Sequence, residues 1–330
     1  MTLMQKLLGA AAGLALTAGA ASADPALIFD LGGKFDKSFN ESMFNGSEKF
    51  KAETGIAYGE FEIANEAQRE QAIRNFADQG YSPIIAAGFA QAAAVEKVAK
   101  EYPDLKFAIV DMVVDLPNVQ SIVFKEEEGS YLVGLLAGMA SKSGKVGFVG
   151  GMDIPLIRKF GCGYAQGVKA AKADATIYQN MTGDTGAAWN DPVKGGEITK
   201  GQMAQGADVV YAAAGATGLG VLQAAADGGA LSIGVDANQN YLHPGNVLTS
   251  MMKRVDVAVY NVMKAGNAGF KPGIQALGLA EDGVGVAMDD NNKPLITPEM
   301  QAAVDKAKAD IIAGTIKVHD YTEDNTCPVQ

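Results

Sequence analysis

Two stretches of the sequence, residues 83–88 (PIIAAG) and 209–215 (VVYAAAG), begin similar segments in the two halves of the chain. Each is a short apolar run that ends in glycine and leads into an Ala-rich helical pattern. A second apolar run then ends in aspartate, Asp111 in the first half and Asp236 in the second, at a similar spacing from the glycine. The sequence therefore predicts one strand–helix–strand unit used twice. The alternative is a chance similarity of two Ala-rich units.

Each unit has a glycine and an aspartate at the carboxyl ends of neighbouring predicted strands, Gly88 with Asp111 and Gly215 with Asp236. Open parallel sheets hold ligands at this edge. Asp30 stands in the same position after the first predicted strand. We therefore expect these residues to surround one cleft between two lobes that are joined by hinge strands.

Short β-branched runs alternate with amphipathic stretches along nearly the whole chain, a pattern typical of parallel sheets covered by helices on both faces. Strands are expected at residues 26–30, 56–61, 83–87, 106–110, 146–150, 175–179, 208–212 and 231–235. Helices are expected at residues 65–79, 91–101, 126–142, 156–172 and 217–226. The predicted fold class is α/β, with two doubly wound parallel-sheet lobes. The length of 330 residues agrees, because a domain takes roughly 150.

The N-terminal segment from Met1 to Ala23 differs from the rest of the chain. Lys6 is its only charge, residues 7–20 are apolar, and residues 21–23 (ASA) form a small-residue cleavage pattern. This predicts a signal peptide cleaved after Ala23. Residue 24 is Asp rather than the Cys of a lipoprotein, and no later segment has ~18 uninterrupted apolar residues. We expect a soluble periplasmic protein without a lipid anchor.

The charge balance argues against nucleic acid as a partner. Lys and Arg number 27 against 38 for Asp and Glu, which gives a net charge of −11, and no basic stripe offsets it. Nucleic-acid binding needs clustered cations.

Cys162 and Cys327 are the only cysteines, too few for a disulfide scaffold and wrongly spaced for a tetrahedral metal site. In an oxidising compartment they predict a single disulfide. The alternative is two buried free thiols. We expect no metal.

Catalytic and cofactor motifs are weak in this sequence. His243 and His319 suggest no Ser-His-Asp or Cys-His arrangement. Residues 215–220 (GATGLG) lack the GxGxxG order and a GK[ST] ending, so we expect no nucleotide cofactor. The acidic run at residues 126–128 is interpreted as a solvated helix start, favoured by the helix dipole.

A set of residues suited to recognition remains. Phe39 and Asn40 lie in the predicted loop after the first strand, where an aromatic ring can stack on a heterocycle and an amide can pair with base edges. Trp189, the only Trp, lies in a loop before a helix, with a partly exposed capping aromatic as the alternative. Asp111 and Asp236 suit the vicinal diol of a sugar, with helix or turn caps as the alternative.

Five motifs resemble those of the basic membrane protein (BMP) family of ABC-transporter substrate-binding proteins, which is similar to the purine nucleoside receptors. They run in order along the mature chain, at residues 28–33 (IFDLGG), 36–40 (DKSFN), 102–111 (YPDLKFAIVD), 118–129 (NVQSIVFKEEEG) and 233–236 (IGVD). The resemblance implies a type I periplasmic-binding fold that holds a nucleoside between two lobes.

Site residues follow from the resemblance by position. Asp30 and Asn40 would bind the base, and Phe39 would stack on it, with Trp189 as a second aromatic. The sugar would be held by Asp111, Asp236 and Lys253. Leu31 stands where relatives often carry a polar residue, which leaves the base preference open.

We therefore expect a monomeric receptor, without cofactor or catalytic activity, that captures a nucleoside (a purine nucleoside) and delivers it to an inner-membrane ABC permease. The first lobe is predicted to comprise residues 24–124 and 251–279, and the second lobe residues 125–250 and 280–330, with crossings near 124, 250 and 279. One alternative keeps the fold and binds a free nucleobase or a sugar-like signal. The other is an enzyme such as a nucleoside hydrolase.

Overall fold

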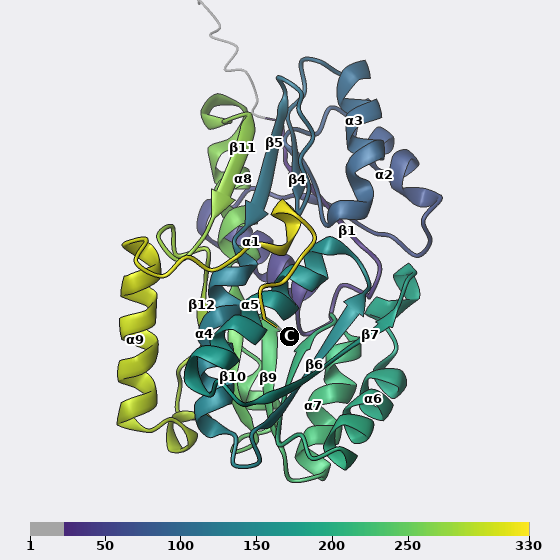
Figure 1. Cartoon of the computed structure of the whole chain (residues 1–330). Helices are drawn as coiled ribbons and strands as arrows, with labels where there is room; N and C mark the ends of the chain where they lie inside the picture. The colour runs from purple at the N-terminus through teal and green to yellow at the C-terminus, as the bar shows by residue number, and fades with distance from the viewer. Residues whose placement is uncertain (1–22, 330) are drawn as a thin grey trace, which may run out of the picture.

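The protein folds around two six-stranded sheets (Figure 1). A computed structural model describes residues 23–329; the predicted signal peptide therefore lies outside the described residues, apart from Ala23. The first sheet has the order β11 (Gly273–Leu277), β5 (Val119–Phe124), β4 (Phe107–Val110), β3 (Ile84–Ala86), β1 (Ala26–Phe29) and β2 (Gly59–Glu62). The second has the order β12 (Val284–Val286), β10 (Val247–Lys253), β9 (Leu231–Asp236), β8 (Val209–Ala213), β6 (Lys145–Met152) and β7 (Thr176–Gly183).

Neighbouring strands pair in parallel in both sheets, except that β12 is antiparallel to β10. The central strands β1, β3, β4 and β8 are buried on both faces, as parallel strands between two helical layers must be. The predicted α/β class is confirmed. All eight predicted strands and all five predicted helices are present, with shifts of a few residues at their ends.

Helices cover both faces of each sheet (Figure 1). In the first lobe α1 (Phe39–Thr54) packs with α8 (Val255–Gly269), and α2 (Gln68–Asp78) packs with α3 (Ala92–Glu101). In the second, α4 (Glu126–Ala140) packs with α5 (Pro155–Ala171), and α6 (Pro192–Ala204) packs with α7 (Thr217–Asp227). The last helix, α9 (Pro298–Ile312), lies against α4. Phe39 and Asn40, expected in a loop, instead form the first turn of α1, so that prediction was wrong.

Helices α4 and α5 pack backbone to backbone. A Cβ atom on Gly134 would lie 2.2 Å from the carbonyl oxygen of Tyr164, and one on Gly167 would lie 2.0 Å from that of Tyr131. Only glycine permits this approach, since real Cβ atoms do not come so close to backbone. The contact brings the first turns of both helices to the boundary between the sheets, where the ligand cleft is expected.

The chain passes between the two sheets after β5, after β10 and after β11. The second passage follows Lys253, so residues 251–253 belong to β10 in the second sheet. The sequence-based boundary had placed them in the first lobe. No helix within residues 23–329 is long and apolar enough to cross a membrane.

The C-terminal segment is tied to α5 by a disulfide between Cys162 and Cys327, with a Cα–Cα distance of 5.7 Å. Cys162 is buried in α5, and Cys327 follows the short helix η5 (Tyr321–Glu323). We expect the unreduced, denatured protein to contain no free thiol and the reduced protein to contain two, because export exposes both cysteines to oxidation. Thiol titration checks this. Two thiols without reductant would contradict it.

Candidate functional site

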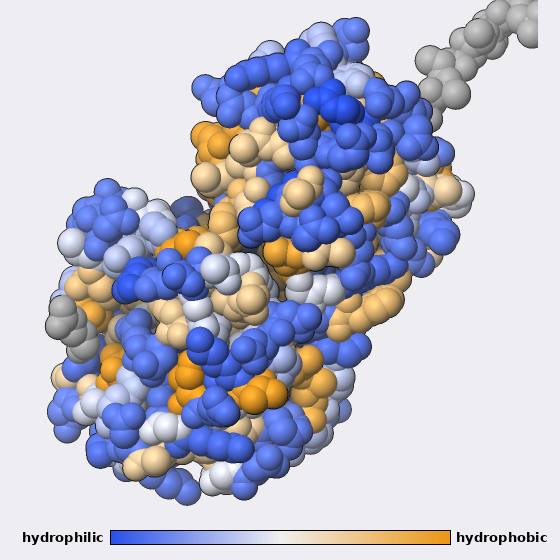
Figure 2. All heavy atoms as spheres, turned by 90° about the vertical axis from the view of Figure 1, so that its right-hand side faces the viewer, coloured by the Kyte–Doolittle hydropathy of each residue, from blue (hydrophilic) through white to orange (hydrophobic). Residues whose placement is uncertain are grey.

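One cavity lies between the carboxyl ends of the two sheets, and Figure 2 shows the surface hollowed between the two lobes. All nine residues expected from the sequence to surround a ligand line it. They are Asp30, Phe39, Asn40, Gly88, Asp111, Trp189, Gly215, Asp236 and Lys253. Asp236 and Lys253 are the last residues of β9 and β10, and Trp189 ends a short helix before α6. The others come from the start of α1 and from the loops that follow β1, β3, β4 and β8. The topology therefore brings together positions that are far apart in the sequence, such as Asp30 and Lys253.

The repeated unit seen in the sequence extends to the backbone conformation. Asp111 and Asp236 both adopt a left-handed backbone, with φ of 70° and 64°. Gly88 and Gly215 do the same, with φ of 91° and 57°. A positive φ is unfavourable for a residue with a side chain, by roughly 1–2 kcal/mol. The same unfavourable conformation thus occurs at equivalent places in both lobes.

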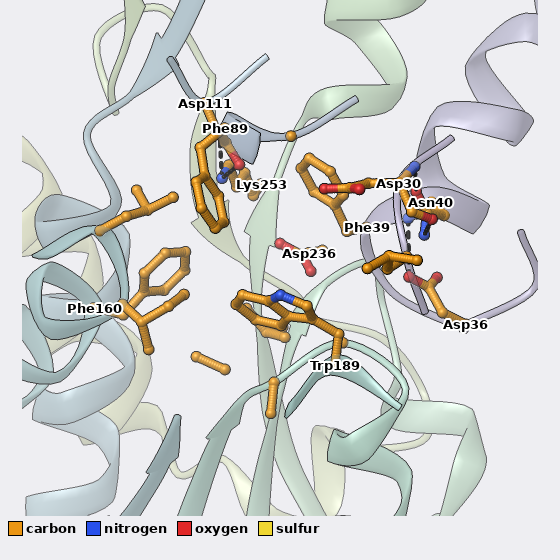
Figure 3. A pocket seen from close by; sticks show the side chains of 18 residues that line it. Asp30, Asp36, Phe39, Asn40, Phe89, Asp111, Phe160, Trp189, Asp236 and Lys253 are labelled. Atoms are coloured by element: carbon orange, nitrogen blue, oxygen red, sulfur yellow. Dashed lines mark hydrogen bonds and ion pairs between the residues drawn. The ribbon is translucent and has the colours of Figure 1, made fainter. Parts of the chain in front are cut away.

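A buried charge cluster lies at the deep end of the cavity, beside the chain crossings (Figure 3). The Lys253 ammonium nitrogen lies 2.7 Å from the Asp111 carboxylate and 2.9 Å from Glu126 Oε1. Lys253 is 2% exposed. The ring centroids of Phe39 and Phe160 lie 5.4 and 5.5 Å from the same nitrogen. One cation thus links the end of β10 to the ends of β4 and β5.

The shared ammonium affects the ionisation of both carboxyl groups. Burial raises the pKa of Asp111 to about 6, although Lys253 opposes the shift. Burial also acts against ionisation of Glu126, but Lys253 and Lys159 together outweigh it and lower the pKa of that group. Burial opposes the charge on Lys253 as well, yet the carboxylates, Asp111 first, raise its pKa above the usual value. The cluster therefore keeps a charged lysine at neutral pH.

The acidic run at the start of α4 is not solvated, so the sequence interpretation was wrong there. Glu126 and Glu127 are 1% and 6% exposed. Lys159 of α5 lies 3.1 and 3.4 Å from their carboxylates and also 3.3 Å from Asp320 in the C-terminal segment. The close packing of α4 on α5 brings these charges together. Through Glu126, the acidic run also contacts Lys253, which lines the cavity.

Asp236 connects the two lobes across the cavity. The Ser38 hydroxyl, just before α1, donates a hydrogen bond of 2.5 Å to Asp236 Oδ2. Nearby, Gln239 Nε2 donates to the Lys37 carbonyl at 2.9 Å. Burial raises the pKa of Asp236, against the influence of Lys253 and the Ser38 hydrogen bond. These two hydrogen bonds join the lobes across the cavity. Sequence reasoning had not identified Ser38.

Asp30 lies at the other end of the cavity. Its Oδ1 accepts a hydrogen bond of 3.0 Å from Arg69 in α2, a partner that no sequence motif indicates. A Cβ atom on Gly88 would lie 2.7 Å from Asp30 Oδ2, so glycine leaves room for this carboxylate. Burial raises the pKa of Asp30, and Arg69 counteracts it. Asp30 can accept hydrogen bonds from a ligand through Oδ2.

Asn40 lines the cavity but uses its amide within its own lobe. Its Oδ1 accepts from the Asp30 backbone N–H at 3.2 Å, and its Nδ2 donates to the carbonyls of Asp30 and Gly33 at 3.2 Å each. Both amide donors therefore have backbone partners. The expectation that this amide donates to a base edge needs correction: Asn40 holds the loop between β1 and α1.

Four aromatic rings line the cavity. Figure 3 shows Phe39 and Trp189 on opposite sides of Asp236, and Phe89 and Phe160 together on the side away from Asp30. Trp189 ends the short helix η2 (Gly186–Trp189). Phe89 and Phe160 were missed by sequence reasoning, although Phe89 directly follows a glycine that was identified.

These groups can hold a ligand that has both flat and hydroxylated parts. Neither His243 nor His319 lines the cavity. Within residues 23–329, no group of three or more His, Cys, Asp or Glu side chains is placed to hold a metal ion. Aromatic faces and acceptor carboxylates are the means of recognition that the cavity offers.

Comparison with known proteins gives the same picture. Residues 25–322 match the model of the family described as ABC transporter substrate-binding protein PnrA-like. A CD4+ T-cell-stimulating antigen of Listeria monocytogenes is 37% identical over 317 residues, covering 89% of this chain and 87% of that protein. The ABC transporter nucleoside-binding protein BmpA of Lactococcus lactis is 33% identical over 320 residues, covering 89% and 88%.

Among solved structures, an ABC transporter solute-binding protein of Aeropyrum pernix superposes with a TM-score of 0.84 at 28% identity, covering 92% of this chain and 95% of the other. The fold is thus that of the solute-binding proteins. With a family model that spans nearly all the described residues, the chain belongs to the Bmp family of PnrA-like ABC transporter substrate-binding proteins.

Proposed function

We propose that this protein is an exported receptor that binds a nucleoside, specifically a purine nucleoside, and presents it to the permease of an ABC importer. The observation that carries the proposal is the composition of the cavity, in which aromatic rings lie beside carboxylates held at the strand ends of both lobes. The nucleoside-binding relative from Lactococcus lactis supports the ligand class. We assign the protein no catalytic activity.

The base would lie between Phe39 and Trp189, whose rings offer flat apolar faces. Asp30 Oδ2 would accept a hydrogen bond from a base N–H, while Asn40 keeps the loop in place. A purine that carries an N–H at this edge would suit an acceptor better than one that presents only a ring nitrogen.

The ribose would lie at the deep end. Asp111 and Asp236 would each accept hydrogen bonds from the vicinal hydroxyls, and such charge-assisted bonds are short and strong. The Lys253 ammonium has three donors, and its two carboxylate neighbours engage two of them. The third N–H would donate a hydrogen bond to a hydroxyl or to the ring oxygen of the sugar.

Closure of the lobes would follow from ligand binding. A nucleoside that contacts Asp30 and Asp111 of one lobe and Asp236 of the other has more partners in the closed form, and so shifts the equilibrium toward it. The three passages between the sheets would act as hinges, dividing residues 24–124 and 254–279 from the rest of the mature chain. The permease would bind the closed form. We place the mature, monomeric protein in the periplasm.

The proposal is tested by the ligand that the protein carries. Protein purified without added nucleoside, then denatured and analysed by mass spectrometry, should release a nucleoside. Release of a free base or a sugar alone would reject the nucleoside assignment. Prolonged incubation of the purified protein with inosine should release no hypoxanthine; steady release would reveal an enzyme instead.

Affinity for the nucleoside is expected to fall as the pH drops below about 6. Ribose hydroxyls donate to ionised Asp111, whose pKa burial raises to about 6 in the free protein. Binding therefore favours the deprotonated form, and the association constant should decrease by up to tenfold per pH unit below that value. Calorimetric titrations from pH 8 to pH 5 measure the change.

Asp111→Asn is the control for this prediction, because it removes the titrating group and keeps the shape. In that variant the affinity should fall less between pH 6 and pH 5 than it does in the wild-type protein. An affinity of the wild-type protein that stays constant from pH 8 to pH 5 would contradict the role given to Asp111.

A further inference from the structure

One side of the cavity is apolar. Phe89, Leu156, Ile157 and Phe160 line it, three of them from the start of α5. Phe160 and Ile157 are 3% and 5% exposed, so their positions are fixed by the core. We call these four residues the α5 wall. In Figure 3 its two labelled members, Phe89 and Phe160, lie on the opposite side of Asp236 from Asp30 and Asn40.

The charges near the α5 wall are unfavourable to an anion. Among the described residues that line the cavity, Lys253 is the only cation, and Asp111 and Glu126 already lie within 2.9 Å of its nitrogen. Asp111 and Asp236 add negative charge at the same end. A phosphate there would exchange its hydration for carboxylate neighbours and aromatic edges, with no unpaired cation to balance it.

The stereochemistry of a nucleoside determines that its 5′ carbon is the atom that points toward the α5 wall. The base leaves the furanose ring at C1′ and the 5′ carbon leaves it at C4′, on either side of the ring oxygen, whereas the two hydroxyls lie on the opposite edge. When the base points toward Asp30 and the hydroxyls contact Asp111 and Asp236, the 5′ carbon points away from Asp30. That direction leads to Phe89 and Phe160.

We propose that the α5 wall is a subsite for an apolar substituent on the 5′ carbon. The receptor then takes 5′-deoxy-5′-alkylthio nucleosides as well as plain nucleosides, and it excludes nucleoside 5′-phosphates. This inference rests on the proposed nucleoside function and on the orientation given above.

Calorimetry with a ligand series tests the proposal. The series comprises one purine nucleoside, its 5′-methylthio, 5′-ethylthio and 5′-propylthio derivatives, and its 5′-monophosphate. We expect the methylthio derivative to bind at least as tightly as the parent, and each added methylene that reaches the wall to improve affinity about fourfold. The monophosphate should bind at least a hundredfold more weakly. Affinity that falls along the alkylthio series, or a monophosphate within tenfold of the parent, would overturn the subsite.

Variants locate the subsite. Leu156→Ala should reduce the affinity ratio of the propylthio derivative to the parent nucleoside, both measured in the same variant. Leu116→Ala, a partly buried leucine outside the cavity lining, should leave that ratio as in the wild type. An unchanged ratio in Leu156→Ala would place the substituent elsewhere.

The outcomes separate the subsite from the proposed function. If the parent nucleoside does not bind, the nucleoside function itself fails. If the parent binds but alkylthio groups bring a loss, only the α5 wall assignment fails.

Discussion

Asp236→Ala is expected to weaken nucleoside binding at least tenfold, and about a hundredfold if the carboxylate holds both ribose hydroxyls. A hydrogen bond to a charged group contributes roughly 1.5–3 kcal/mol, and each 1.4 kcal/mol is a factor of ten. The alanine would also leave the Ser38 hydroxyl without its 2.5 Å partner and remove a contact that holds the lobes together. Titration calorimetry measures the loss.

The loss should depend on the sugar. The wild-type protein should discriminate against 2′- and 3′-deoxy nucleosides. The variant should discriminate less, because it keeps only Asp111 of the two carboxylates that would bind those hydroxyls. If the variant loses affinity equally for the nucleoside and for its free base, Asp236 has a structural role only.

Asp282→Ala is a matched control. Asp282 also has a left-handed backbone, with φ of 54°, but it is exposed and lies outside the cavity lining. It therefore reproduces the strain of placing alanine in that conformation without touching the ligand. Nucleoside affinity in this variant should remain that of the wild type.

Lys253→Met is expected to lower the free energy of unfolding by about 3–5 kcal/mol, because removal of one partner leaves the charges of a buried ion pair uncompensated. Here two carboxylates, Asp111 and Glu126, would lose the ammonium that lies within 2.9 Å of each. Chemical denaturation at pH 7 measures the effect. A decrease below about 1 kcal/mol would show that the cluster is solvated.

Two comparisons support the interpretation of Lys253→Met. Lys97→Met removes a lysine that is 58% exposed and lies 2.8 Å from Glu70. Its effect on the free energy of unfolding should be much smaller than that of Lys253→Met, because solvent screens exposed ion pairs. The triple variant Lys253→Met, Asp111→Asn, Glu126→Gln removes all three charges and should regain much of the stability lost in the single variant. If the triple variant is no more stable than the single one, packing around Lys253 rather than charge explains the loss.

The free energy of unfolding of the Lys253→Met variant should depend on pH, and the direction of this dependence follows from the pKa values of the buried carboxyl groups. Without the ammonium, burial raises the pKa of Asp111 further in the folded state, and Glu126 loses the larger of the two lysine interactions that lower its pKa. The folded variant then binds more protons than the unfolded chain at intermediate pH, so its stability decreases as the pH rises. The difference in the free energy of unfolding between the variant and the wild type should therefore become smaller as the pH falls from 7 to 5.

The sequence could predict the positions at the strand ends because topology alone decides them. In a parallel sheet every carboxyl end lies on one edge, so Gly88, Asp111, Gly215 and Asp236 could be assigned to a cleft before any side-chain contact was known. That inference rested on the pattern of a glycine followed by an aspartate, which occurs in both halves of the chain. The structure places all four on the cavity.

Three of the missed elements, α1, α6 and β12, give only a weak pattern of apolar residues. Helix α1 buries polar residues, among them Asn40, Ser42 and Ser47, because it lies against the cleft and against α8. Helix α6 contains three glycines, and β12 has only three residues. Helices α8 and α9 and strands β5, β10 and β11 were also missed. Of these, β5 has an apolar run, VQSIVF, that the pattern could have revealed.

Partners of the site residues could not be predicted, because they come from distant segments. Nothing in the sequence near Asp30 points to Arg69, and nothing near Glu126 points to Lys159. The buried state of the acidic run depends on the close packing of α4 and α5, which a sequence pattern does not reveal. Asn40 shows the same limit: its residue type suits a base edge, but local backbone groups use its donors.

Titration of the purified protein, freed of bound ligand, with a purine nucleoside and then with its free base and with ribose is the most direct test of the nucleoside assignment. We predict one site per chain, with the nucleoside bound at least a hundredfold more tightly than either part, because only the whole molecule contacts the aromatic rings and the carboxylates of both lobes at once. A free base that binds as tightly as the nucleoside, or a nucleoside that produces no binding heat across several temperatures, would contradict the account.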